Sequence, residues 1–339
     1  MKTTSVLSCG FNHSTLPESY VRPESQRPRM SEVVDRDDLV PVIDMSCTDR
    51  NVIVHQIGEA CRLYGFFQVI NHSVSKKVMD EMLGVAHEFF KLPVEEKMKL
   101  YSDDPSKTMR LSTSFNVKRK LFIIGDIILG YTVILWTNMP LNGLLILLLS
   151  VSKYCMEVRQ LGYRLEEVIS ESLGLEKDCI KNVLGEQGQH MAINFYPPCP
   201  QPELTYGLPA HTDPNAITIL LQDLQVAGLQ VLQDGEWLSI KPQPDAFVIN
   251  LGDQLEAMSN GKYKSIWHRA IVNSDKARMS VASFLCPNDC SIISAPKTLI
   301  EDGSSAIYRD FTYTEYYDKF WSRNLDQEYC LELFKNDGT

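Results

Sequence analysis

The sequence lacks the features that mark several large protein classes. No basic patch is present in a chain with 33 Lys and Arg against 43 Asp and Glu residues and a net charge of −10. Nucleic-acid binding needs a positive surface, so no nucleic-acid partner is expected. The nine cysteines form no paired framework, and Cys286 and Cys290 have no second pair to complete a zinc site. Free thiols suit a reducing cytosol, so a cytoplasmic location is predicted.

Other absences concern the chain's organisation. Residues 1–37 are polar and rich in Pro and Ser, with no apolar signal-peptide core, and are predicted to form a disordered arm. No internal repeat or low-complexity segment occurs. The 339 residues suffice for one large core, and a monomer is the default expectation.

Hydrophobic periodicity predicts a mainly β protein with flanking helices. Residues 38–150 are predicted to form an N-terminal α/β region, with strands over 40–45 and 66–71 and helices over 49–64, 75–92 and 93–100. Residues 151–339 begin with a long helix over 154–173 and end with helices over 312–320 and 326–334. Between them lie short β-rich runs at 191–196, 216–222, 229–232, 237–240, 246–250, 267–272 and 279–286. This spacing is typical of a sandwich or jelly roll.

Two imidazoles and one carboxylate are the strongest chemical signal. His211 and Asp213 lie two residues apart, so an extended chain directs both side chains to one face. His268 follows far enough along for a sheet to fold back and deliver a third ligand. This set holds non-haem Fe(II) in a facial triad with open positions. The same residue types could instead hold zinc in a hydrolase.

Arg278 and Ser280 form a second signal. Residues 272–276 are predicted to form a turn, which would pair the strands of His268 and Arg278 in a hairpin. A guanidinium binds a carboxylate through two parallel hydrogen bonds, and a serine hydroxyl can add a third. A metal beside such a clamp suits a small dicarboxylate cosubstrate.

These motifs together resemble the plant 2-oxoglutarate- and Fe(II)-dependent dioxygenases, whose core is a double-stranded β-helix. Within that family the chain is most similar to the downy-mildew-resistance type, the salicylate 3- or 5-hydroxylases. The resemblance covers about residues 40–120 and 151–335, and Ser73 stands where relatives usually carry Gly. The further motifs that carry it are Gly65–His72, the Asn-Phe-Tyr-Pro-Pro-Cys run at 194–199 and Ser259–Ser265.

The resemblance implies a role for each site residue. His211, Asp213 and His268 would hold Fe(II), with no catalytic residue beyond these ligands. Arg278, Ser280, Tyr196 and Asn194 would bind 2-oxoglutarate, although Tyr196 could equally be a core aromatic. Phe284 is the candidate aromatic of the substrate pocket, and a plain core Phe is the alternative interpretation. Asn250 and Asp253 are expected to fix a tight loop.

The implied activity is oxidative decarboxylation of 2-oxoglutarate coupled to O2 activation and hydroxylation of a small phenol. Salicylic acid is the first candidate, which would give a role in salicylate catabolism and negative regulation of plant immunity. Ascorbate would serve as reductant, and the partners would be O2 and the small substrate. Flavonoid oxidation, of the flavone synthase or flavanone hydroxylase type, is the alternative within the family. A catalytically impaired member is the other alternative.

Residues 121–149 are the reason for considering impairment. No charged residue occurs from Ile127 to Leu149, but Gly130, Pro140 and Gly143 interrupt the run, and no membrane span is predicted. Relatives carry a polar, aromatic stretch here. A coding sequence can be written for that stretch of the relatives so that the same nucleotides, read one nucleotide later, encode residues 128–148 of this chain. We therefore hypothesise that 121–149 is translated out of frame, through an error or a genuine pair of indels.

Overall fold

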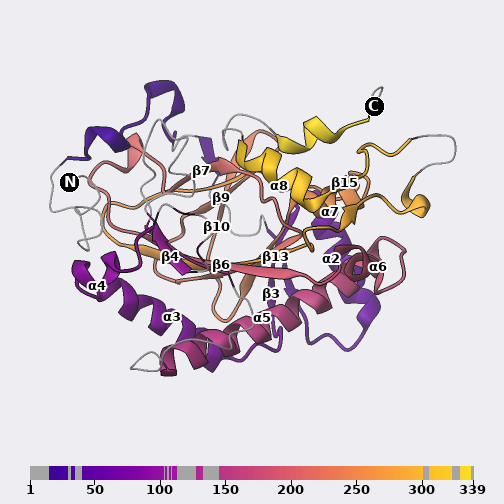
Figure 1. Ribbon diagram of the computed structural model, residues 1–339, viewed down its shortest axis with the longest axis horizontal. Coiled ribbons are helices and arrows are strands. Elements are labelled where there is room, and N and C mark those ends of the chain that lie inside the picture. Colours follow the sequence, from indigo (N-terminus) through magenta and orange to yellow (C-terminus); the bar gives the residue numbers. More distant parts are fainter. Residues whose placement is uncertain are drawn as a thin grey trace.

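Two β-sheets facing each other form the centre of the protein (Figure 1). The computed structural model describes residues 15–29, 32–34, 40–102, 104, 107, 109–112, 127–132, 145–300, 305–322 and 329–336. For 127–132 and 145–148 it describes the backbone alone. The smaller sheet has the order β1 (Val33–Val34), β10 (Glu236–Ile240), β9 (Leu229–Gln233), β12 (His268–Ala270) and β7 (Leu208–His211).

The larger sheet has eight strands and combines both regions predicted from the sequence. Its order is β2 (Val42–Asp44), β3 (Phe66–Ile70), β11 (Phe247–Leu251), β8 (Ile217–Gln222), β13 (Arg278–Cys286), β6 (Gly188–Tyr196), β5 (Ile127–Thr132) and β4 (Met109–Ser112). A separate short pair joins β14 (Ile292–Ile293) to β15 (Phe311–Thr312). The predicted mainly β architecture with a double-stranded β-helix core is confirmed.

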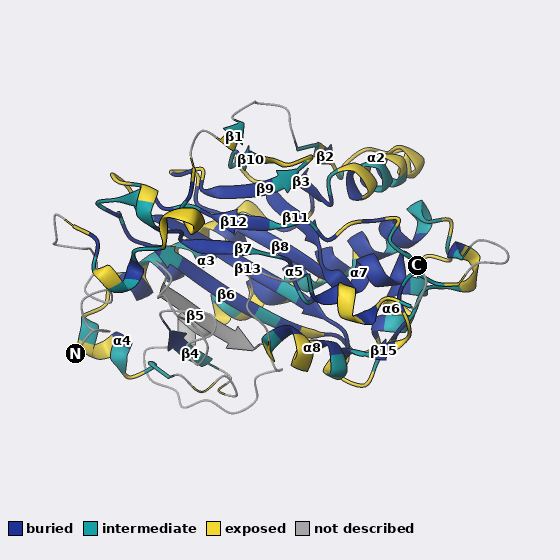
Figure 2. Cartoon of the chain, turned by 90° about the horizontal axis from the view of Figure 1, so that it is seen from above, coloured by how far each residue is buried: buried dark blue, intermediate teal, exposed yellow. Residues whose placement is uncertain are grey.

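Apolar side chains from both sheets meet in a small inner core, and Figure 2 shows most of these strands as buried. Leu229 and Val231 on β9 and Leu238 and Ile240 on β10 contribute from the smaller sheet. The larger sheet contributes Phe66, Leu220, Val248 and Ala282. Alternation along the strands of the larger sheet sends the neighbouring residues to its opposite face, where the larger core lies.

The helices α2 (Arg50–Leu63), α3 (Lys76–Lys91) and α5 (Leu145–Ser172) cover that opposite face of the larger sheet (Figure 1). The other helices are α4 (Val94–Met98), α6 (Cys179–Leu184), α7 (Asp253–Met258) and α8 (Tyr313–Ser322), of which α6, α7 and α8 pack beside β14 or β15. Short 3-10 turns are η1 (Glu18–Tyr20), η2 (Glu24–Gln26), η4 (Pro202–Leu204), η5 (Lys297–Leu299) and η6 (Cys330–Phe334). Val158, Leu161 and Leu165 form the buried stripe of α5, and each such side chain contributes roughly 1.5–3 kcal/mol.

Local signals explain where the N-terminal helices begin. The Asp49 carboxylate accepts a hydrogen bond from the Asn51 amide at 2.9 Å, and the Ser75 hydroxyl accepts one from the Val78 amide. These caps satisfy amides that have no partner within the helix. The helices predicted over 49–64 and 75–92 are therefore confirmed with boundaries shifted by about one residue.

The hairpin predicted between the strands of His268 and Arg278 is wrong. Strand β12 pairs with β7 and β9, whereas β13 pairs with β6 and β8 in the other sheet. The expected turn does exist, because the Asn273 side chain accepts hydrogen bonds from the amides of Asp275 and Lys276. It carries the chain from one sheet to the other, since both sheets need these strands to enclose the inner core.

The terminal segments also differ from the prediction. Residues 1–14 lie outside the described residues, but 15–29 are ordered, so a disordered arm is wrong for that part. Leu16 and Tyr20 are buried in the larger core, which gives the segment apolar contacts that offset its ordering entropy. The helix predicted over 326–334 is the 3-10 turn η6, with 323–328 outside the described residues.

The unusual segment 121–149 is described in part. Residues 121–126 and 133–144 lie outside the described residues. Between them, β5 pairs with β6 on one side and β4 on the other, and α5 begins at Leu145 rather than near 154. In the part of the chain that the structure describes, no helix has the length and apolar character needed to cross a membrane.

Candidate metal centre and cosubstrate site

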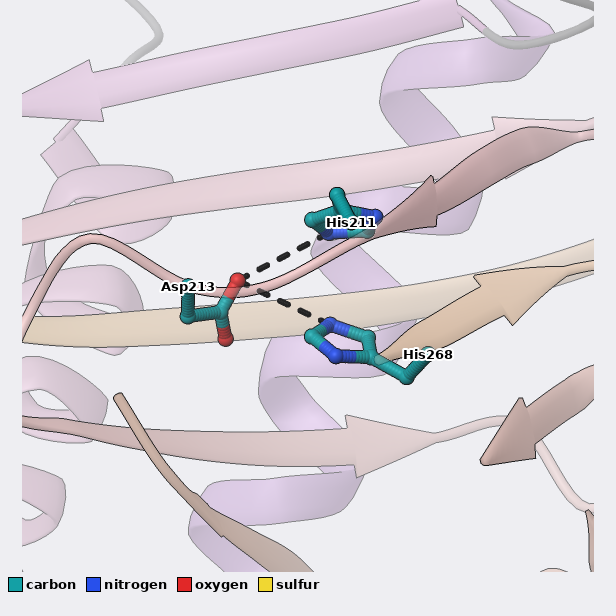
Figure 3. A group of neighbouring side chains, drawn as sticks. All are labelled: His211, Asp213 and His268. Carbon is teal, nitrogen blue, oxygen red and sulfur yellow. Dashed lines mark ion pairs between the residues drawn. The ribbon is translucent and has the colours of Figure 1, made fainter. Parts of the chain in front are cut away.

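His211, Asp213 and His268 lie together between the sheets (Figure 3). Their ligand atoms are all within 4.8 Å of one another. Among the described residues, these three form the one cluster of His, Cys, Asp or Glu side chains that could hold a metal ion. The two histidines are brought together because their Cα atoms face each other across β7 and β12. Asp213 follows two residues after His211, just beyond the end of β7. The predicted convergence of the three residues is confirmed.

The side chains point at a common centre. Asp213 Oδ1 lies 3.6 Å from Nε2 of His211 and 3.6 Å from Nε2 of His268. His211 Nδ1 donates to the Pro209 carbonyl at 2.9 Å, and His268 Nδ1 donates to the Ile266 carbonyl at 3.1 Å. A proton on each Nδ1 leaves the Nε2 lone pair free to bind a metal. The separations leave room for an ion bonded at about 2 Å to each donor.

The other carboxylate oxygen of Asp213 is held by two side chains. The Thr218 hydroxyl donates to Oδ2 at 2.5 Å, and the Asn250 amide donates to it at 2.8 Å. Burial acts to raise the pKa of Asp213, but His268, His211 and these hydrogen bonds outweigh it, so the pKa lies below its usual value. The carboxylate is therefore ionised and fixed in orientation, as a metal ligand requires.

Asn250 was expected to fix a loop, and the structure gives it a direct bond to the triad instead. Asp253 does have the expected structural role, since its carboxylate accepts hydrogen bonds from the Thr212 and Tyr316 hydroxyls. Thr218 was missed because nothing in its spacing from Asp213 marks it. Only the pairing of β8 with β11 places it beside Asn250.

A second group of polar residues surrounds Arg278. This guanidinium is buried, and its Nη2 donates to Gln222 Oε1 at 2.8 Å, with Nη1 at 3.5 Å from the Ser280 hydroxyl. Its Cζ lies 5.3 Å from the centre of the Tyr196 ring. Burial lowers the pKa of Arg278, and Tyr196 opposes that shift. Gln222 was missed, although a polar residue ending the apolar run Ile217–Leu221 was a usable signal.

Strand register accounts for the rest of this group. Ser280 faces Asn194 on β6 and Gln222 on β8, while Arg278 faces Tyr196. Directly opposed residues share one face of the sheet, so the predicted Arg278, Ser280, Tyr196 and Asn194 all lie on the inner side. Tyr196 is thus a core aromatic that also contacts the guanidinium.

The charge of the buried guanidinium is only partly compensated within the described chain, since Tyr196 hydrogen-bonds it and Asp223 attracts it without forming an ion pair. No carboxylate of the described residues forms an ion pair with Arg278, and Arg278 Nε, Gln222 Nε2 and Asn194 Oδ1 have no hydrogen-bond partner there. An unpaired buried charge is costly, and a bound carboxylate would relieve that cost. These residues therefore fit the distal carboxylate of a dicarboxylate, and the triad fits Fe(II).

Phe284 lies on the same face, four residues further along β13 than Ser280. It is half-buried and packs at the edge of the inner core. Its Cα faces Thr218 on β8, whose hydroxyl bonds Asp213. Phe284 is therefore close to the metal centre and partly accessible. The described cysteines, including Cys286 and Cys290, are all free, in line with the absence of a paired framework.

Comparison with known proteins agrees with this geometry. Residues 187–287 match the model of the 2OG-Fe(II) oxygenase superfamily, and residues 40–126 match that of the non-haem dioxygenase N-terminal region named for morphine synthesis. The chain is 60% identical to Protein DOWNY MILDEW RESISTANCE 6 of Arabidopsis thaliana, covering 98% of this chain and 99% of that protein. It is 58% identical to Flavanone 3-dioxygenase 2 of Oryza sativa subsp. japonica, covering 95% of each.

A solved structure shares the whole fold. The crystal structure of JOX2 in complex with 2OG, Fe and JA superposes with a TM-score of 0.87 at 33% identity, covering 99% of this chain and 98% of that one. The fold, the family matches and the full-length relatives all agree with the resemblance drawn from the motifs. The chain is therefore an enzyme that uses Fe(II) and 2-oxoglutarate, and it belongs to the downy-mildew-resistance type of the plant 2-oxoglutarate-dependent dioxygenases.

Proposed function

We propose that this enzyme hydroxylates a small phenolic acid, with salicylate as the first candidate. The observation that carries the proposal is the position of Phe284, a half-buried aromatic facing Thr218, which is bonded to Asp213. An aromatic ring there can pack against a substrate ring beside the metal centre. The similarity to a relative named for downy mildew resistance supports a role in plant defence. As part of the same proposal, that role is salicylate catabolism and negative regulation of plant immunity.

Each residue of the site has one task in this proposal. His211, Asp213 and His268 hold Fe(II), and Thr218 and Asn250 orient the aspartate. Arg278 and Ser280 bind the distal carboxylate of 2-oxoglutarate, with Tyr196 and Asn194 beside it. When bound, iron and 2-oxoglutarate supply the oxidative decarboxylation that activates O2. One oxygen atom enters the phenol and the other enters succinate, with release of CO2. Ascorbate would keep the iron reduced.

Two further expectations accompany this function. We expect a cytoplasmic location, since free cysteines suit a reducing compartment. We also expect a monomer. The substrate and O2 would be its partners, with no nucleic acid and no membrane involved.

Flavonoid oxidation is the second candidate, favoured by the similarity to Flavanone 3-dioxygenase 2. The test is succinate formation by the purified enzyme with Fe(II) and 2-oxoglutarate, with salicylate or naringenin added. Salicylate-dependent succinate together with a dihydroxybenzoate product supports the proposal. Naringenin as the only stimulating substrate contradicts it. His211→Ala should abolish the reaction, and retained activity would contradict the metal assignment.

An impaired enzyme is the remaining alternative. Strand β5 belongs to the unusual segment 121–149, and its register sets Gly130 beside Ala192 and Thr132 beside His190 on β6. Part of this segment thus borders the strand that carries Asn194 and Tyr196. The test compares this chain with one in which 121–149 is restored to the family-like frame. Activity of the restored protein alone would indicate a lesion or an error, and equal activity would remove this alternative.

A further inference from the structure

One row of facing residues crosses the larger sheet at the level of the metal centre. Asn250 on β11 faces Thr218 on β8, Thr218 faces Phe284 on β13, and Phe284 faces His190 on β6. The register is continuous along each pair, so all four side chains are on one face. Asn250 and Thr218 both bond Asp213, which establishes that this face is the inner one.

The row runs across the strands from the metal centre towards β6, whereas the carboxylate clamp lies further along the strands. Successive strands lie about 4.8 Å apart, so His190 is roughly 10 Å from Thr218 with Phe284 between them. The clamp residue Ser280 is four residues from Phe284 along β13, a distance of roughly 13 Å. A cosubstrate between the metal centre and the clamp therefore leaves the Phe284 and His190 end for the substrate.

Burial and side-chain size distinguish this end of the row. Asn250 and Thr218 are both 3% exposed, whereas Phe284 and His190 are only half-buried. The next inner row towards the clamp places Ala282 opposite Ala192. Both side chains are single methyl groups, so a flat ring beside Phe284 would meet small side chains there.

Resting on the proposed function, we propose that His190 selects the substrate by donating a hydrogen bond to the carboxylate that the substrate's aromatic ring carries. Phe284 packs against that ring. The span from Thr218 to His190 suits a single substituted ring, such as a hydroxybenzoate. Burial lowers the pKa of His190, with Asp289 opposing the shift. A neutral imidazole still carries one donor. His190 would thus be a specificity-determining residue.

The test compares salicylate with salicylamide, in which a carboxamide replaces the carboxylate. His190→Leu should raise KM for salicylate roughly ten- to hundredfold, the range expected for losing a hydrogen bond to a charged group. KM for salicylamide and for 2-oxoglutarate should change little. His190→Gln keeps a donor and should retain most of the selectivity. His55→Gln, on the exposed side of α2, is the matched control and should match the unmodified enzyme.

Two results would overturn this inference. One is an equal rise in KM for both compounds in His190→Leu, which would indicate a structural role, and the other is no change for either. A separate measurement distinguishes failure of the proposed function. Under anaerobic conditions, aromatic acids that bind should perturb the absorption of the Fe(II)–2-oxoglutarate complex. If salicylate is not hydroxylated but benzoate and salicylate bind in a His190-dependent way, only the proposed reaction fails. Binding that is independent of His190 overturns the inference itself.

Discussion

Replacing Gly228 with alanine should weaken 2-oxoglutarate binding, although no residue of the clamp is itself substituted. A Cβ at Gly228 would lie 2.6 Å from Arg278 Cδ, 3.0 Å from Arg278 Nε and 3.0 Å from the Ile271 carbonyl oxygen. The backbone here is held, because the Ile271 amide donates to the Gly228 carbonyl at 2.8 Å. The Arg278 side chain must therefore be the part that moves.

The expected magnitude follows from the geometry of the guanidinium. Its planar fork binds a carboxylate only in a fixed orientation, so a displaced Arg278 loses charge-assisted hydrogen bonds. A hydrogen bond to a charged group contributes about 1.5–3 kcal/mol, which corresponds to a roughly 10- to 150-fold loss of affinity for 2-oxoglutarate. The triad lies elsewhere on the inner face, so Fe(II) binding should be unchanged.

The assay is anaerobic titration of the Fe(II)-loaded enzyme with 2-oxoglutarate, followed by KM for 2-oxoglutarate in succinate formation. Gly84→Ala is the matched control, since a Cβ at this exposed position of α3 meets no heavy atom within 4 Å. It should bind 2-oxoglutarate as the unmodified enzyme does. A folded Gly228→Ala protein with undiminished affinity for 2-oxoglutarate would refute the assignment of Arg278.

Three further predictions concern stability. Burial raises the pKa of Glu166 from 4.5 to about 7, so this group's stabilising contribution is present below pH 4.5 and is lost as pH rises through 7. Between pH 4.5 and 7 the free energy of unfolding of Glu166→Gln should therefore rise relative to that of the unmodified protein by up to about 3 kcal/mol, measured by urea unfolding. A pH-independent difference between the two proteins would contradict this. Ser73 has φ of 69°, so Ser73→Gly should stabilise by about 1 kcal/mol, and a lower Tm would count against it. Gly162→Ala should lower Tm, because the added methyl overlaps Leu285 and overpacking costs about 1–3 kcal/mol, whereas Gly84→Ala should raise it.

The hairpin shows where sequence reasoning about the site was limited. The turn at 272–276 was identified correctly from its polar residues, and both flanking strands exist. A turn's residues determine its local shape, but not whether the strands on either side pair with each other. In this fold β12 completes the smaller sheet and β13 the larger one, since each gains apolar partners there. The metal and clamp residues still converge, because the two sheets face each other.

The triad, the Arg-x-Ser pair, the amphipathic helices and the alternating strands could all be predicted from the chain's residues. Those depend on spacing and periodicity, which the chain carries directly. The polar residues that support the site could be identified only from the folded chain. Gln222, Asn250 and Gly228 act through partners tens of residues away, and Thr218 through Asp213 across the connection that leads from β7 to β8. Register depends on how both faces of a sheet are buried at once, a property of the folded chain and of no single segment.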